Sequence, residues 1–97
     1  MRYILKEGVS LAGLQIEMRL AMRVAGKVYA LQGKTYLKIT SGTDGSHGIG
    51  SLHPYGLALD IELPPNPRSA VATIQREVGS AYDIILEKDH IHMEYDP

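Results

Sequence analysis

Cysteine, tryptophan and phenylalanine are all absent from this chain of 97 residues. Without cysteine there is no disulfide, no thiolate metal ligand and no cysteine nucleophile, so any metal must be held by His, Asp or Glu. An excess of one charge is also lacking, because ten basic and eleven acidic residues leave a net charge of −1. Nucleic-acid binding requires a clearly basic face, so this balance argues against a nucleic-acid partner.

Long apolar runs are missing as well. Lys6 and Glu7 end the N-terminal apolar stretch before it reaches the length of a signal-peptide core. Arg19, Arg23 and Lys27 interrupt the next stretch, so no segment is expected to span a bilayer. We therefore expect a protein that is made in the cytoplasm and has no membrane partner. If it acts outside the cell, another factor must release it.

The length and the patterning predict one α+β domain, residues 1–97. One apolar stripe with helical spacing predicts a helix that begins at Leu11, after a Ser10 cap, and ends at Gly33; the stripe is Leu14, Met18, Ala21, Met22, Ala25 and Tyr29. Ser69 is expected to cap a second, shorter helix that Gly79 closes.

Alternation of polar and apolar residues predicts strands over residues 34–40, 56–63, 82–86 and 90–95. Three residues separate the last two strands, which indicates a hairpin. The segment 41–51 contains four glycines and is expected to be a loop. The expected architecture is a small antiparallel sheet with helices packed on one side.

The four histidines all lie after residue 46, at positions 47, 53, 90 and 92. On the last strand, alternation places His90, His92 and Glu94 on one face, opposite the apolar residues. Asp60 projects from the strand that follows His53, on the side away from the aliphatic residues. A catalytic zinc site needs three protein ligands and a further position for water, and two imidazoles with one carboxylate supply such a set.

These residues resemble the peptidase M15 family, the zinc D-Ala-D-Ala carboxypeptidases and dipeptidases, which includes phage L-alanyl-D-glutamate endopeptidases. The family shares a core with lysostaphin-type peptidases and the Hedgehog signalling domain. Its pattern is Ser-x-His-x-x-Gly-x-Ala-x-Asp, followed later by an acidic residue, two residues and His, often as His-x-His. The chain matches it at Ser51, His53, Gly56, Ala58 and Asp60, and then with Asp-His-Ile-His at 89–92. The resemblance covers residues 39–95.

The resemblance implies one zinc ion per chain, held by His53, Asp60 and His92. It implies that Asp89 is the general base or acid, and that His90 stabilises the oxyanion or orients the water. Ser51 is implied to support the ligands or contact substrate.

Glu87 is the competing candidate for the base, because it precedes His90 by three residues just as Asp89 precedes His92. Since His90 and His92 share a face of the strand, alternation does not decide which of them binds the metal. Glu62 and Glu94 are expected to face solvent or to orient a ligand histidine.

The chain departs from the family in several places. The family commonly has Ser-Gly-Tyr-Arg, whose arginine helps to bind the substrate. This chain has Ser-Gly-Thr-Asp at 41–44 instead. His47 is a candidate for the substrate-binding task of that arginine. The usual tryptophan near the last ligand is absent, and the chain is shorter than most members.

The expected function is therefore hydrolysis of cell-wall (peptidoglycan) peptides at bonds that involve D-amino acids, by a phage lysin or a virion-associated hydrolase. An intracellular dipeptidase is equally consistent with the sequence. The alternative is a weak or inactive zinc-binding module of the same fold. Asp89 favours the enzyme, because an inactive module need not retain an acid at that spacing.

Overall fold

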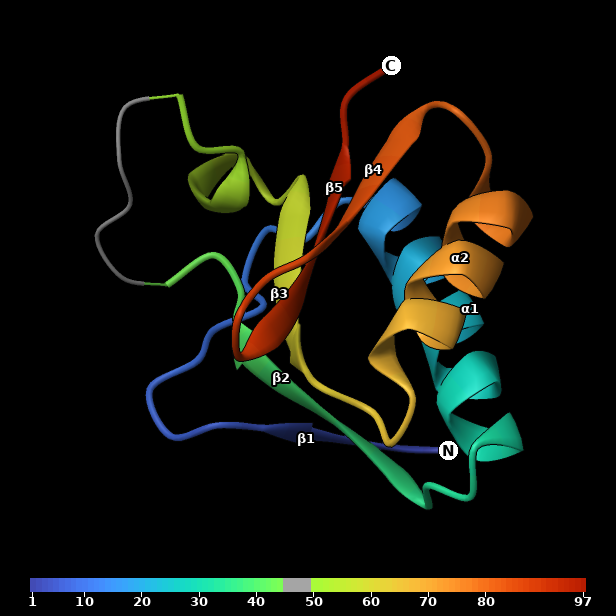
Figure 1. Cartoon of the computed structure of the whole chain (residues 1–97). Helices are drawn as coiled ribbons and strands as arrows, with labels where there is room; N and C mark the ends of the chain where they lie inside the picture. Colours follow the sequence, from blue (N-terminus) through green and yellow to red (C-terminus); the bar gives the residue numbers. More distant parts are fainter. Residues whose placement is uncertain (45–49) are drawn as a thin grey trace.

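A five-stranded sheet with two helices against one face forms the domain in the computed structural model, which describes residues 1–44 and 50–97 (Figure 1). The strands are β1 (Arg2–Leu5), β2 (Tyr36–Ser41), β3 (Ala58–Glu62), β4 (Tyr82–Leu86) and β5 (His90–Tyr95). The helices are α1 (Ile16–Leu31) and α2 (Pro67–Val78), and the short 3-10 helix η1 (His53–Tyr55) precedes β3. The α+β prediction is confirmed.

The strand order is β1-β2-β3-β5-β4, and the sheet is mixed. The pairs β2–β3, β3–β5 and β4–β5 are antiparallel, but β1 runs parallel to β2. The prediction of a purely antiparallel sheet was therefore wrong at one edge, and no strand was predicted over residues 2–5. This four-residue segment carries no clear alternation, and it becomes a strand because β2, more than thirty residues later, pairs with it.

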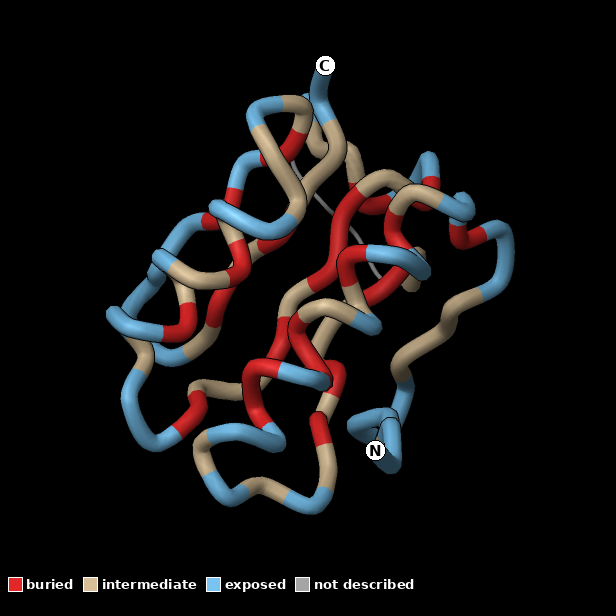
Figure 2. The backbone as a smooth tube through the Cα atoms, turned by 90° about the vertical axis from the view of Figure 1, so that its right-hand side faces the viewer, coloured by how far each residue is buried: buried red, intermediate tan, exposed pale blue. Residues whose placement is uncertain are grey.

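The core lies between the helices and the sheet (Figure 2). The predicted stripe of α1 is buried except for the partly buried Met22, and it packs against apolar side chains of β2, β3 and β5. These strand residues are Leu37, Ile39, Leu59, Ile61, Ile91 and Met93. Because side chains alternate along a strand, Asp60, His90 and His92 project from the opposite face, away from the helices.

Both helices begin at different residues than predicted. The first begins at Ile16, five residues late, because Ser10 accepts a hydrogen bond from the Ala12 amide (3.1 Å) in a turn, and Gly13 follows with a φ of 77°. The second begins at Pro67, where the Asn66 side chain accepts a hydrogen bond from the backbone of Ser69 (3.3 Å). Among the described residues, no helix is long and apolar enough to cross a membrane.

Candidate metal centre

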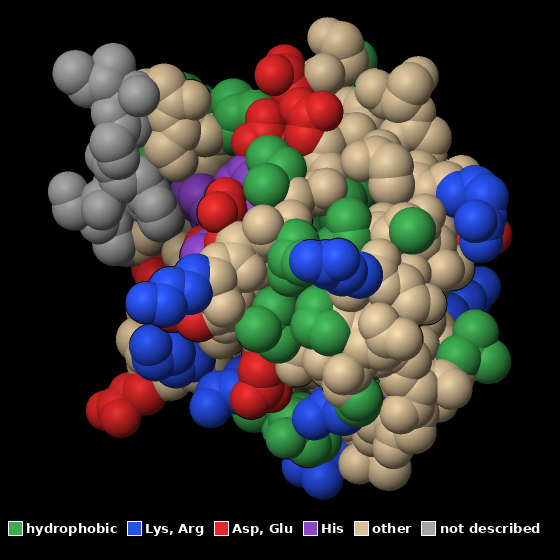
Figure 3. Space-filling model, viewed as in Figure 1, with side chains coloured by type: hydrophobic (Ala, Val, Ile, Leu, Met, Phe, Trp, Pro, Cys, Tyr) green, Lys and Arg blue, Asp and Glu red, His purple; other side chains and the backbone are tan. Residues whose placement is uncertain are grey.

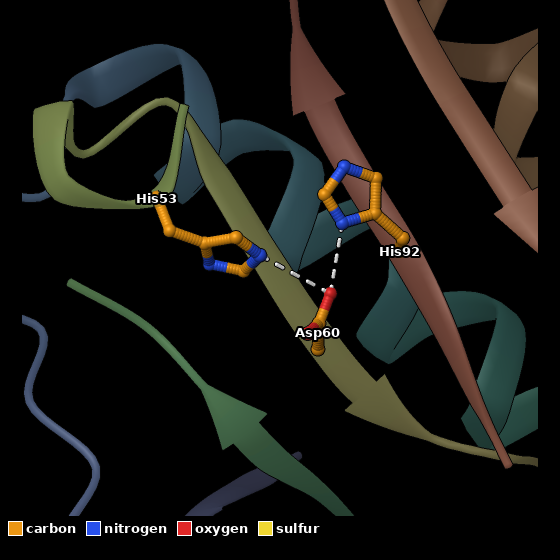
Figure 4. A group of neighbouring side chains, drawn as sticks. All are labelled: His53, Asp60 and His92. Carbon is orange, nitrogen blue, oxygen red and sulfur yellow. Dashed lines mark hydrogen bonds and ion pairs between the residues drawn. The ribbon is translucent and has the colours of Figure 1, made fainter. Parts of the chain in front are cut away.

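His53, Asp60 and His92 meet on the sheet face that the helices leave uncovered (Figure 4). Each offers one ligand atom, and these atoms all lie within 4.8 Å of one another. Asp60 on β3 and His92 on β5 are direct cross-strand partners, and η1 delivers His53 to the same place. The visible histidine side chains lie on this side of the molecule, opposite the helices, with an acidic side chain beside them (Figure 3). The structure thus brings the three predicted metal ligands together.

The ring of His53 is buried and has a fixed orientation. Its Nδ1 lies 2.9 Å from the carbonyl oxygen of Gly42, which can only accept, so Nδ1 carries the proton that it donates. In the neutral ring, Nε2 then presents its lone pair 3.4 Å from Oδ1 of Asp60. Two acceptors facing each other require a positive charge between them, either a proton or a metal ion. This arrangement fits a metal centre.

Gly56 explains why η1 can place His53 beside β3. It ends η1 with a φ of 74°, in the left-handed region that favours glycine. A Cβ at this position would stand 2.2 Å from the carbonyl oxygen of Gly13, so the close packing of the two segments also requires glycine. The Oγ of Ser51 accepts a hydrogen bond from the His53 backbone (3.2 Å). In this structure Ser51 therefore holds the turn that carries His53.

His92 has a carboxylate at each ring nitrogen. Its Nδ1 lies 2.9 Å from Oδ1 of Asp60, and its Nε2 lies 2.6 Å from Oε1 of Glu94. The hydrogen bond with Asp60 raises the pKa of His92, burial lowers it, and the bond with Glu94 raises it further, to about 9. Without a metal, His92 is therefore an imidazolium at neutral pH. Of the two roles predicted for Glu94, contact with a ligand histidine is the one that the structure shows.

Asp60 remains ionised over the whole neutral range. Burial alone would raise the pKa of its carboxyl group, but hydrogen bonds with His53 and His92 outweigh burial and hold the pKa well below its usual value. Metal ligands must be deprotonated to bind, and Asp60 already satisfies this condition.

His90 lies between Asp89 and the three candidate ligands. Its Nδ1 is 2.6 Å from Oδ1 of Asp89, and its Nε2 is 3.8 Å from Oδ2 of Asp60. The hydrogen bond from His90 lowers the pKa of the exposed Asp89 carboxyl group. Glu87 contributes its backbone amide, which donates to the carbonyl of His90 (2.9 Å). Of the two acidic residues, Asp89 is the one whose side chain contacts the His90 imidazole.

Asp44 stands where the resembling family has its arginine. Its Oδ1 accepts hydrogen bonds from the backbone amides of Ser10 and Gly42, both at 2.9 Å. Because the carbonyl of Gly42 in turn orients His53, Asp44 supports the candidate metal centre indirectly, a role that the sequence did not predict. His47, the other predicted substrate-binding residue, lies outside the described residues.

Two imidazole nitrogens and one carboxylate oxygen form a donor set that suits zinc and other divalent ions. His53, Asp60 and His92 are therefore a group that could hold a metal ion. Comparisons of the chain with family models, with curated proteins and with solved structures find no match.

Proposed function

We propose that this chain is a zinc peptidase that hydrolyses bonds involving D-amino acids in peptidoglycan peptides, as a phage lysin or virion-associated hydrolase would. One observation carries the proposal: His53, Asp60 and His92, spread over forty residues of sequence, present their ligand atoms within 4.8 Å. They belong to the two motifs that resemble the zinc D-Ala-D-Ala peptidases.

Holding the metal falls to His53, Asp60 and His92. A zinc ion bound there would lower the pKa of a water molecule to about 7 and polarise the scissile carbonyl. The chain contributes a fixed geometry to this chemistry. The carbonyl of Gly42 keeps the proton of the His53 ring on Nδ1, and the Glu94 carboxylate forms a hydrogen bond with Nε2 of His92.

Proton transfer falls to the pair Asp89 and His90. Asp89 is ionised, lies in the turn that joins β4 to β5 and contacts His90. In the proposed reaction it accepts the proton of the attacking water and passes it to the leaving amine. The Nε2 of His90 faces the ligand group, and with both ring nitrogens protonated it would donate a hydrogen bond to the oxyanion as it develops.

A zinc-binding module without turnover is the second candidate, and one observation favours it. The side chain of Asp89 is 85% exposed, and its short contact is with His90. A general base has to reach the attacking water, either directly or through one intervening water. In the module, the same contact would only orient His90.

The test is hydrolysis of purified peptidoglycan and of D-Ala-D-Ala peptides by the zinc-loaded protein. We expect turnover by the wild type and a loss of roughly 10²–10⁴-fold in Asp89→Asn, with zinc still bound. Glu87→Gln, a neighbouring change in the same turn, should retain wild-type turnover. Zinc-loaded wild type that cleaves neither substrate would establish the module instead. Equal turnover by Asp89→Asn would remove Asp89 as the base.

A further inference from the structure

A groove of about 550 Å³ lies between α1 and β1, on the face of the sheet opposite to the metal centre. Its apolar lining includes Tyr3, Ile16 and Leu20, which are 37%, 67% and 52% exposed. Such a group of exposed large apolar side chains around a concave surface is typical of an interaction site. Gly26 allows this arrangement, since a Cβ there would stand 2.6 Å from the Tyr3 hydroxyl.

The strand beside the groove lies at an edge of the sheet. Among residues 1–44 and 50–97, which the structure describes, β1 is the terminal strand and pairs only with β2 (Figure 1). Its flanking amides bond toward β2, Arg2 to Thr35 (3.5 Å) and Lys6 to Ile39 (2.9 Å). Alternation along the strand therefore turns the backbone groups of Tyr3 and Leu5 toward the free edge. An extended segment could add there as a further strand, with alternate side chains entering the groove.

The charge at the groove is positive. Arg19 and Arg23 line it together with the apolar residues. The sequence around it is basic as a whole, because residues 1–38 contain seven of the ten basic residues and only two of the eleven acidic ones. The metal-centre half of the chain is correspondingly acidic. A partner at the groove is therefore expected to carry negative charge.

We propose that β1 and this groove bind an extended, acidic segment of a partner protein. The segment adds to the free edge of β1, places alternate apolar side chains in the groove and pairs its carboxylates with Arg19 and Arg23. A concave groove beside unpaired backbone groups favours a peptide over a flat lipid surface. The proposal is independent of the metal centre and of the proposed peptidase activity.

The probe is a fluorescein-labelled, acetylated peptide of alternating glutamate and valine, and the control peptide has lysine in place of glutamate. We expect saturable binding of the acidic peptide by fluorescence anisotropy and binding at least about tenfold weaker for the basic one. Hydrogen exchange of the Tyr3 and Leu5 amides should slow in the complex, as strand addition requires.

Charge reversal tests whether Arg19 and Arg23 contribute to binding of the acidic peptide. The double variant Arg19→Glu, Arg23→Glu should weaken binding of the acidic peptide at least about tenfold. Arg76→Glu, on the exposed side of α2, should bind it like the wild type, and both variants should retain the far-ultraviolet circular dichroism of the wild type. Failure of the acidic peptide to bind, equal binding of both peptides, or unchanged exchange at Tyr3 and Leu5 would overturn the proposal. Binding to phosphatidylglycerol vesicles in preference to the peptide would do the same.

Discussion

The two carboxylates that flank His92 would have different tasks with a metal ion bound. A metal ion takes one nitrogen of an imidazole, and the other nitrogen commonly donates to a carboxylate that fixes the ring. The Nδ1 of His92 faces Asp60, which belongs to the same ligand group. Nε2 is therefore the nitrogen left to donate to Glu94, at 2.6 Å.

Replacing Glu94 should weaken metal binding without removing a ligand. We expect Glu94→Gln to lower zinc affinity by roughly 10–100-fold, because the ring of His92 loses its charged orienting partner. Competition with a chromophoric zinc chelator measures this affinity. Glu87→Gln is the control, since its side chain is exposed in the hairpin turn. Equal affinities of Glu94→Gln and wild type would show that Glu94 does not orient His92.

The candidate ligands could be predicted from local sequence together with the family resemblance. Strand alternation places Asp60 on a polar face and puts His90 and His92 together on another, and only the resemblance selects His53 and prefers His92 to His90. The supporting contacts could not be predicted in this way. The hydrogen bonds from the Ser10 amide to Asp44 and from His53 to the Gly42 carbonyl join separate segments, and only the folded chain brings those segments together.

At the scale of elements, the start of α2 rests on Asn66 rather than on Ser69. The Asn66 side chain accepts from the Ser69 backbone, and Pro67 occupies the first helical position, where no amide donor is needed. Asn66→Ala should lower the free energy of unfolding by about 1 kcal/mol. Ser69→Ala should change it by less than about 0.5 kcal/mol. Urea denaturation measures both, and a larger loss in Ser69→Ala would contradict the cap assignment.

The errors in predicting elements have related causes. The apolar stripe of α1 extends back to Leu14, which is buried, although the helix itself begins only at Ile16. An apolar stripe indicates which residues are buried, but a residue in a turn can be buried as well as one in a helix. The stripe therefore did not fix the first residue of the helix. β1 lacks a local signal because its partner is supplied by a distant part of the chain. The hairpin of β4 and β5 joins strands that are adjacent in the sequence, and its strands were predicted correctly.

At the scale of the whole molecule, the charges of the centre couple folding to pH when no metal is bound. The pKa of His92 rises on folding from 6.5 to about 9, so its protonation stabilises the fold. This contribution is fully present below about pH 6.5 and is lost as the pH rises through about 9. The pKa of Asp60 falls below its usual 3.8, so its contribution is present above that pH and is lost as the pH decreases.

Metal-free protein should therefore unfold at a lower urea concentration at pH 9 than at pH 6. Chemical denaturation of the protein after treatment with a chelator measures the two midpoints. His92→Gln has no titrating ring at this position, so its midpoint should change much less between the two pH values. An equal dependence in wild type and variant would contradict the raised pKa of His92.

Metal content of the purified protein, with His92→Ala alongside the wild type, tests the central claim most directly. Both proteins are supplied with zinc, dialysed and analysed for bound metal, and circular dichroism confirms that the variant is folded. We predict about one zinc ion per wild-type chain and a loss of that ion in His92→Ala. Wild-type protein that binds no metal after zinc is supplied, or a folded variant that binds as much as the wild type, would contradict a metal centre at His53, Asp60 and His92.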